Sequence, residues 1–156
     1  MTSLVPELIP VSDDVLLNVQ HFYARQMFLL DENRVAEWLD TFADDGVFRS
    51  TGLPEPLGGR AAIEKLTRAG VEERRCRGAV HRHLLTGLHA DGRPDGSLVA
   101  RSYVLVVETL PEETSRVWAS TVCQDVLFRR GGGWLVRSRQ VSLDRKGHAA
   151  PVLETS

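Results

Sequence analysis

Two residues, Asp31 and His83, are the main candidates for acid–base chemistry in this sequence. A carboxylate beside a histidine orients the imidazole, fixes its tautomer and raises its basicity, so that the ring takes up and returns a proton near neutral pH. A tyrosine nearby, such as Tyr23, would polarise a carbonyl or stabilise an enolate. Together these groups are sufficient for dehydration, aldol cyclisation or isomerisation without a cofactor.

Each of these residues also has a purely structural interpretation. Asp31 would serve equally well as the N-cap of a following helix, where aspartate is favoured. His83 would fit a core whose polar groups are hydrogen-bonded, and Tyr23 would fit a core in which its hydroxyl reaches one partner. The segment Arg137-Ser138-Arg139 is more typical of a surface or an interface than of a substrate clamp. The residue types alone leave these alternatives open.

The hydrophobic periodicity predicts which elements position these residues. A helix is predicted over about 14–30, with Asp13 or Asp14 as its N-cap. Tyr23, Met27 and Asp31 are spaced four residues apart, so Asp31, directly after the helix, is expected on the face of Tyr23. Further helices are predicted over about 33–44, ended by Asp44-Asp45-Gly46, and over about 60–70. A short strand is predicted over 47–50, a loop over 51–59, and longer strands near 80–90, 98–109, 116–129 and 133–143.

Helices followed by a run of strands predict an α+β fold. We expect a cone-shaped domain over 14–145, in which a strongly curved, mainly antiparallel sheet wraps around three N-terminal helices. Residues 1–13 are expected to form an irregular arm and residues 146–156 a flexible tail.

Strand alternation predicts the lining of a cavity between the sheet and the helices. His81 and His83 share one face of their strand, so a shift of register does not separate them. Ser102, Thr121 and Cys123 fall on the faces that carry small residues and fit a pocket lining, although Cys123 is also typical of a small buried hydrophobe. Such a cavity suits a small hydrophobic or aromatic substrate. The bulkier residues on the opposite faces fit a dimer interface.

Composition and charge argue against several classes of function. The chain has 156 residues, is 42% hydrophobic and 26% charged, and has a net charge of −2, which gives no general drive toward nucleic acid or an anionic membrane. No apolar run approaches the ~18 residues of a transmembrane helix. The N-terminus has no signal-peptide pattern, and two cysteines make no disulfide framework, so a cytoplasmic location is expected. No metal-ligand spacing occurs.

Three segments carry a resemblance to a known family. They are FYARQMFLLDENRVAEWLDTFADDGVF (22–48), RHLLTGL (82–88) and GGWLVRSRQVSLD (132–144). They resemble the SnoaL-like, nuclear-transport-factor-2-like (NTF2-like) superfamily, near scytalone dehydratase and the β-subunits of ring-hydroxylating dioxygenases. The resemblance implies that Asp31 matches the acid that orients the base and His83 the catalytic histidine. It places Phe48 where scytalone dehydratase has a substrate-binding tyrosine, and Ser102 near the place of a second histidine.

The resemblance implies a cofactor-independent, homodimeric dehydratase, cyclase or isomerase that acts on an aromatic polyketide-type intermediate in antibiotic biosynthesis. Tyr23, Phe48, Ser102, Thr121 and Cys123 would contact the substrate. Two alternatives stay open: a non-catalytic β-subunit of an aromatic-ring-hydroxylating dioxygenase, and a ligand-binding protein without activity.

Overall fold

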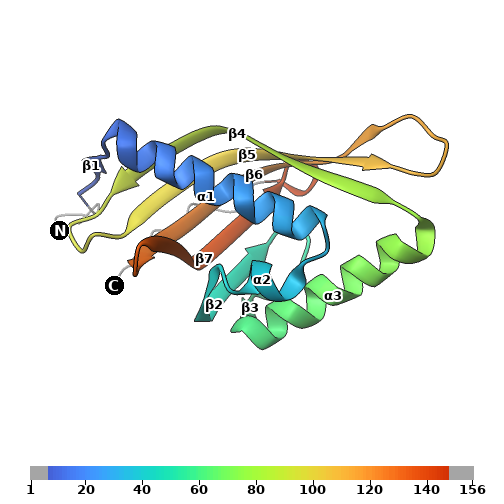
Figure 1. The fold of residues 1–156 in the computed structure, drawn as a ribbon, viewed down its shortest axis with the longest axis horizontal. Coiled ribbons are helices and arrows are strands. Elements are labelled where there is room, and N and C mark those ends of the chain that lie inside the picture. The colour runs from blue at the N-terminus through green and yellow to red at the C-terminus, as the bar shows by residue number, and fades with distance from the viewer. Residues whose placement is uncertain (1–6, 148–156) are drawn as a thin grey trace.

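A seven-stranded sheet with three helices makes up the part of the chain, residues 7–147, that the computed structural model describes (Figure 1). The strand order is β1-β4-β5-β6-β7-β2-β3, and all neighbouring pairs are antiparallel except β2 and β7. The elements are β1 (Ile9–Pro10), α1 (Asp13–Asp31), α2 (Val35–Leu39), β2 (Phe42–Ser50), β3 (Leu57–Gly58), α3 (Arg60–Arg77), β4 (Val80–Gly92), β5 (Leu98–Thr109), β6 (Arg116–Arg130), β7 (Gly133–Leu143) and a short 3-10 helix (Asp144–Lys146). The predicted α+β layout is confirmed.

Helix α1 crosses one face of the sheet, and α2 and α3 lie beside the β2–β3 end (Figure 1). The N-cap of α1 is Ser12, whose hydroxyl accepts the backbone N–H of Val15, so Asp13 and Asp14 belong to the first turn. Their charge still favours the helix because it faces the positive end of the helix dipole. The buried residues of α1 recur at helical spacing and pack on the sheet: Val19, Tyr23, Gln26, Met27 and Leu29.

The predicted helix over 33–44 is wrong beyond Leu39. Phe42 is fully buried and pairs with Val136 of β7, and the Val136 N–H donates to the Thr41 carbonyl at 2.9 Å. Burying the Phe42 ring in the sheet therefore outweighs the helical pattern. The pairing register shifts between Phe42 and Val47, so Asp44-Asp45-Gly46 forms an irregularity within β2 and not a helix stop.

Other boundaries also differ from the predicted ones. Helix α3 continues past residue 70 to Arg77, because side chains three or four residues apart form ion pairs along it, and it ends at Gly78 in the left-handed conformation (φ 65°). The arm expected over 1–13 includes β1, which pairs with β4, and the loop expected over 51–59 includes β3. Of the tail expected over 146–156, residues 148–156 lie outside the described residues, as do residues 1–6 of the arm.

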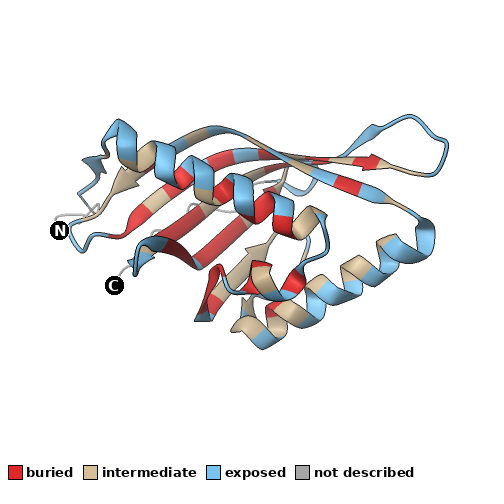
Figure 2. Cartoon of the chain, in the orientation of Figure 1, coloured by how far each residue is buried: buried red, intermediate tan, exposed pale blue. Residues whose placement is uncertain are grey.

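The core lies between α1, α2 and the inner face of the sheet (Figure 2). Buried positions alternate along β5 and continue across β6 and β7, as expected for a sheet with one covered face. The helices of residues 7–147 include none that is both long and apolar enough to cross a membrane.

Candidate active site

A cavity of about 410 Å³ lies between the helices and the inner face of the sheet. All of the residues that the sequence assigned to a substrate pocket line it, together with the predicted base: Tyr23, Phe48, His83, Ser102, Thr121 and Cys123. Asp31 lies behind His83 and lines a smaller neighbouring cavity of about 130 Å³, to which His83 also contributes.

Asp31 and His83 are in direct contact through two hydrogen bonds. The His83 backbone N–H donates to Asp31 Oδ2 at 3.0 Å, and His83 Nδ1 lies 2.6 Å from Asp31 Oδ1. The two side chains are 7% and 18% exposed, respectively. A carboxylate only accepts hydrogen bonds, so the proton of the neutral imidazole is placed on Nδ1. That leaves Nε2 with a free lone pair, as a general base requires.

The cap interpretation of Asp31 is wrong. Asp31 is the last residue of α1, and Arg34 occupies the N-cap position of α2 without a side-chain cap bond. Both Asp31 oxygens are directed to His83. The acid is therefore held by β4, 52 residues later in the chain, and not by the helix that follows it.

His81, which sequence alternation grouped with His83, has a different partner. Its Nε2 lies 2.8 Å from Glu108 Oε2, and Glu108 also accepts hydrogen bonds from Arg77 and Arg116. These hydrogen bonds from Arg77, Arg116 and His81 keep the pKa of the Glu108 carboxyl well below its usual range. Burial lowers the pKa of His81, opposed by its bond to Glu108. The acid of His81 is therefore shared with two arginines, whereas the acid of His83, Asp31, has no other hydrogen-bond partner within residues 7–147.

A buried ionic cluster forms one wall of the cavity. Arg139 donates from Nε to Asp125 Oδ1 at 2.9 Å and from Nη2 to Asp125 Oδ2 at 2.8 Å, and also donates to Gln26 at 2.6 Å. The Tyr23 hydroxyl donates to Asp125 Oδ2 at 2.8 Å. The prediction that Arg139 lies at a surface or an interface is wrong, since it is 6% exposed.

This cluster changes the role available to Tyr23. Burial and the neighbouring Asp125 raise the pKa of Tyr23 well above its usual value, so the phenol stays protonated. Its proton is already donated to Asp125. Toward a substrate, Tyr23 can therefore accept a hydrogen bond from a hydroxyl group but has no free proton with which to polarise a carbonyl.

The other polar residues of the cavity differ in what they can donate. Thr121 Oγ1 donates to the Val104 carbonyl at 2.8 Å, so it also faces the cavity as an acceptor. Ser102 is buried in the cavity wall, and its hydroxyl has no hydrogen-bond partner within residues 7–147. Ser102 is therefore the hydroxyl in this set that is free to donate to a substrate oxygen.

Two features of the site were not predicted from the sequence. The Asp125–Arg139 pair joins residues directly opposite each other on β6 and β7. Finding it from the sequence would require both the inward-facing positions of each strand and the pairing register of the hairpin. Strict strand alternation would put Trp118 on the face opposite its neighbour Ala119, but both line the cavity. The register of β5 and β6 shifts at this point, and the Trp118 ring lies 5.0 Å from that of His81. A bulge of this kind redirects a side chain.

Cys123 is expected to react slowly with thiol reagents at neutral pH. Burial raises the pKa of its thiol to about 11, so on the order of 10⁻³ of it is thiolate at about pH 8. In a Cys76→Ser variant, which lacks the exposed cysteine, the rate of alkylation should be low at neutral pH and rise as pH is raised toward 11. Rapid labelling of that variant at neutral pH would contradict this assignment.

No group of three or more histidine, cysteine or carboxylate side chains within residues 7–147 has an arrangement suited to a metal ion.

Known proteins share both the sequence pattern and the fold. A family model for the SnoaL-like domain matches residues 15–140. Aln2 from a Streptomyces species is 29% identical, with a TM-score of 0.80 over 88% of this chain and 95% of that one. A Catenulispora acidiphila protein, solved in complex with S-DNPA, is 36% identical, with a TM-score of 0.74 over 86% of this chain and 97% of that one.

A more distant structure bears on the fold alone. An NTF2-like protein with a cystatin-like fold from Novosphingobium aromaticivorans is 21% identical, with a TM-score of 0.73 over 89% of this chain and 88% of that one. A search of curated proteins gives no match.

Proposed function

Because the chain belongs to the SnoaL-like family, which includes polyketide cyclases and dehydratases, we propose that it is a cofactor-independent dehydratase or cyclase. Its substrate would be an aromatic polyketide-type intermediate of secondary metabolism. The observation that carries this proposal is the 2.6 Å contact between Asp31 Oδ1 and His83 Nδ1 at the wall of a largely apolar cavity. It supports a base that is oriented by an acid and exposed to a bound substrate.

The proposed reaction begins when His83 Nε2 removes a proton from a carbon next to a substrate carbonyl. The electron pair left on that carbon delocalises into the carbonyl as an enolate, whose oxygen accepts the free hydrogen bond of Ser102. The enolate then expels a hydroxyl group from the β-carbon, and the His83 imidazolium returns its proton to that group to release water. Asp31 stabilises the imidazolium between the two proton transfers. In cyclisation, the same base and acid would serve carbon–carbon or carbon–oxygen bond formation.

The lining of the cavity supports an aromatic substrate. Phe48 and Trp118 contribute aromatic faces, and aliphatic side chains such as Val104 fill most of the remaining wall. Phe48 replaces the tyrosine of scytalone dehydratase, so the substrate would meet an apolar surface there. Tyr23 and Thr121 would accept hydrogen bonds from substrate hydroxyls. The related Catenulispora acidiphila protein was itself solved in complex with S-DNPA.

A turnover experiment tests the proposal. Purified protein is incubated with aromatic polyketides that carry a β-hydroxy ketone, and loss of water is followed by absorbance and mass spectrometry. We expect turnover of a member of this panel and a loss of ~10²–10⁴-fold in His83→Ala. His89→Ala is the matched control, because His89 also contacts an aspartate, Asp91, but is exposed and outside the cavity. Tight binding without any turnover would favour a ligand-binding protein, and equal loss in both variants would contradict the role of His83.

The proposed enzyme is a homodimer. The outer face of the sheet carries Leu84 and Tyr103, which are 49% and 53% exposed on the neighbouring strands β4 and β5. Exposed apolar residues grouped in this way are typical of interfaces. We expect sedimentation to give a dimer and Leu84→Arg to shift it toward monomer, while Arg82→Glu on the same strand has a smaller effect. A trimer would favour the alternative of an oxygenase β-subunit.

A further inference from the structure

Arg74 differs from the other arginines of α3 in having no partner. Each of the others bonds a carboxylate or a carbonyl: Arg60 to the Phe42 carbonyl, Arg68 to Glu64, Arg75 to Glu72, and Arg77 to Glu73 and Glu108. Within residues 7–147, the Arg74 guanidinium has no hydrogen bond and no ion pair. An unpaired arginine is common on the exposed face of a helix, but Arg74 lines two cavities.

Arg74 lines the substrate cavity and also the smaller cavity beside the dyad. His83 borders both spaces as well, so the guanidinium and the proposed base face the same region. The Arg74 side chain runs back along α3 over Gly70, where a Cβ atom would lie 3.2 Å from its Nη1. Helical side chains point toward the helix N-terminus in this way. The absence of a side chain at Gly70, itself part of the cavity wall, leaves room for the guanidinium.

The surroundings leave the Arg74 guanidinium without a hydrogen-bonded acid. Burial lowers its pKa, an effect that nearby Glu73 and Asp31 oppose without forming a hydrogen bond to it. The other acid nearby, Glu108, is already bonded by Arg77, Arg116 and His81. The second arginine of the cavity, Arg139, is neutralised by Asp125. Arg74 is therefore the cation of this cavity wall that is available to an incoming anion.

We propose that Arg74 binds a carboxylate of the substrate, so that the molecule that enters the cavity is a free aromatic acid. This inference rests on the proposed function and specifies its substrate class. The planar guanidinium donates two parallel hydrogen bonds to a carboxylate, which fixes orientation as well as adding affinity. A thioester on a carrier protein has no such charge at that carbon. The reaction that supplies this substrate must therefore be a hydrolytic release from the carrier.

A binding experiment tests the inference without requiring turnover. The probes are 2-naphthylacetic acid and its methyl ester, which share an aromatic body and differ in the charge, and their affinities are measured by calorimetry. We expect the acid to bind about tenfold more tightly than the ester. In Arg74→Gln this preference should disappear while the affinity for the ester is kept, and Arg74→Lys should keep part of the preference. Circular dichroism verifies that each variant is folded.

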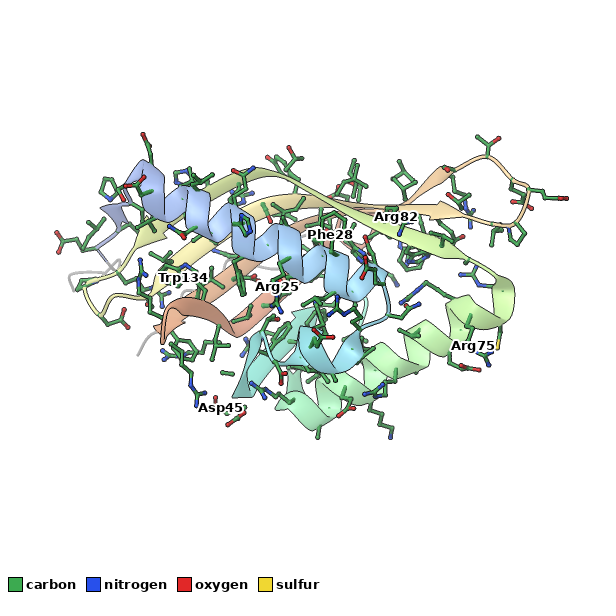
Figure 3. All side chains as sticks on the ribbon, viewed as in Figure 1. Arg25, Phe28, Asp45, Arg75, Arg82 and Trp134 are labelled. Carbon is green, nitrogen blue, oxygen red and sulfur yellow. The ribbon has the colours of Figure 1, made fainter. Side chains whose placement is uncertain are left out.

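Arg75→Gln is the matched control, because Arg75 is the next residue of α3 but pairs with Glu72 on the outside (Figure 3). It should bind both probes as the native protein does. Equal affinities of acid and ester for the native protein would overturn the inference. So would failure of the acid to bind at about 1 mM, which is weak for a ligand of this size.

Two further outcomes separate this inference from its premise. If 4′-phosphopantetheine displaces the acid, the anion bound by Arg74 is the phosphate of a carrier arm, and the free-acid substrate is wrong. If the acid binds as expected but no polyketide is turned over, the carboxylate site stands and the proposed catalytic function fails.

Discussion

Replacing Arg139 with methionine is expected to lower the free energy of unfolding by about 3–5 kcal/mol, the cost of breaking a buried ion pair from one side. Arg139 supplies Asp125 with bonds to both of its oxygens, and Asp125 is 2% exposed. Without the guanidinium, a carboxylate would remain in an apolar interior with the Tyr23 hydroxyl as its remaining partner. The loss is large because both oxygens of a carboxylate that is 2% exposed lose a charged donor.

Urea denaturation measures this loss, with Arg137→Met as the matched control. Arg137 lies two residues away, at the shift in pairing register between β6 and β7, where it is exposed and stacks on Phe128. It should change the unfolding free energy by less than ~1 kcal/mol. A double variant, Arg139→Met with Asp125→Leu, should lose less than the single Arg139→Met, because no uncompensated charge remains. If Arg139→Met cost no more than Arg137→Met, the pair would not hold this wall of the cavity.

The long elements of the fold were predictable because their patterns persist over many residues. The bounds of β5 and β7 match the predicted strands closely, and α1 follows the spacing of Val19, Tyr23 and Met27. The failures occur where tertiary contacts override a local pattern. The stretch around Phe42 has helical periodicity, yet its backbone pairs with β7, nearly 100 residues away in the chain. No local signal shows that partner.

The site was predictable to the extent that strict alternation holds. Ser102, Thr121 and Cys123 fall on one face and do line the cavity. At Trp118 the alternation fails because a bulge inserts one residue into β6. The partner of Asp125 also depends on the register of the β6–β7 hairpin, which the run of glycines in the turn does not define. Residue type is therefore a poor guide to Arg139, whose burial follows from its cross-strand neighbour.

The Asp31–His83 contact could be predicted only through family resemblance, because the two residues lie far apart in the chain. Helical spacing places Asp31 after Met27, and alternation pairs His83 with His81, but neither pattern brings the acid to one histidine. In the structure, the position of the C-terminal end of α1 determines which histidine Asp31 contacts, because it places the Asp31 carboxylate within hydrogen-bond distance of the His83 backbone N–H. His81 lies two residues away, and Glu108 holds it instead.

Asp31→Asn is expected to lower the proposed activity by about 10²–10⁴-fold, because it moves the proton of the neutral His83 ring from one nitrogen to the other. The His83 backbone N–H, which now donates to Asp31 Oδ2, can only donate. In the variant, the single amide oxygen must turn toward that N–H, and the amide NH2 then faces His83 Nδ1. Nδ1 must accept, so the proton of the neutral ring moves to Nε2. The nitrogen that faces the substrate then has no lone pair with which to act as a base.

This prediction has a readout that needs no substrate. Nitrogen-15 spectra of the imidazole distinguish the two neutral tautomers, and we expect the Nδ1–H form of His83 in the native protein and the Nε2–H form in Asp31→Asn. Asp91→Asn, next to exposed His89, is the matched control and should leave the His83 signals unchanged. Asp31→Ala removes the constraint without imposing a tautomer, so it should retain more activity than Asp31→Asn. The opposite order of activities, or an unchanged tautomer in Asp31→Asn, would show that Asp31 does not act by orienting the His83 ring.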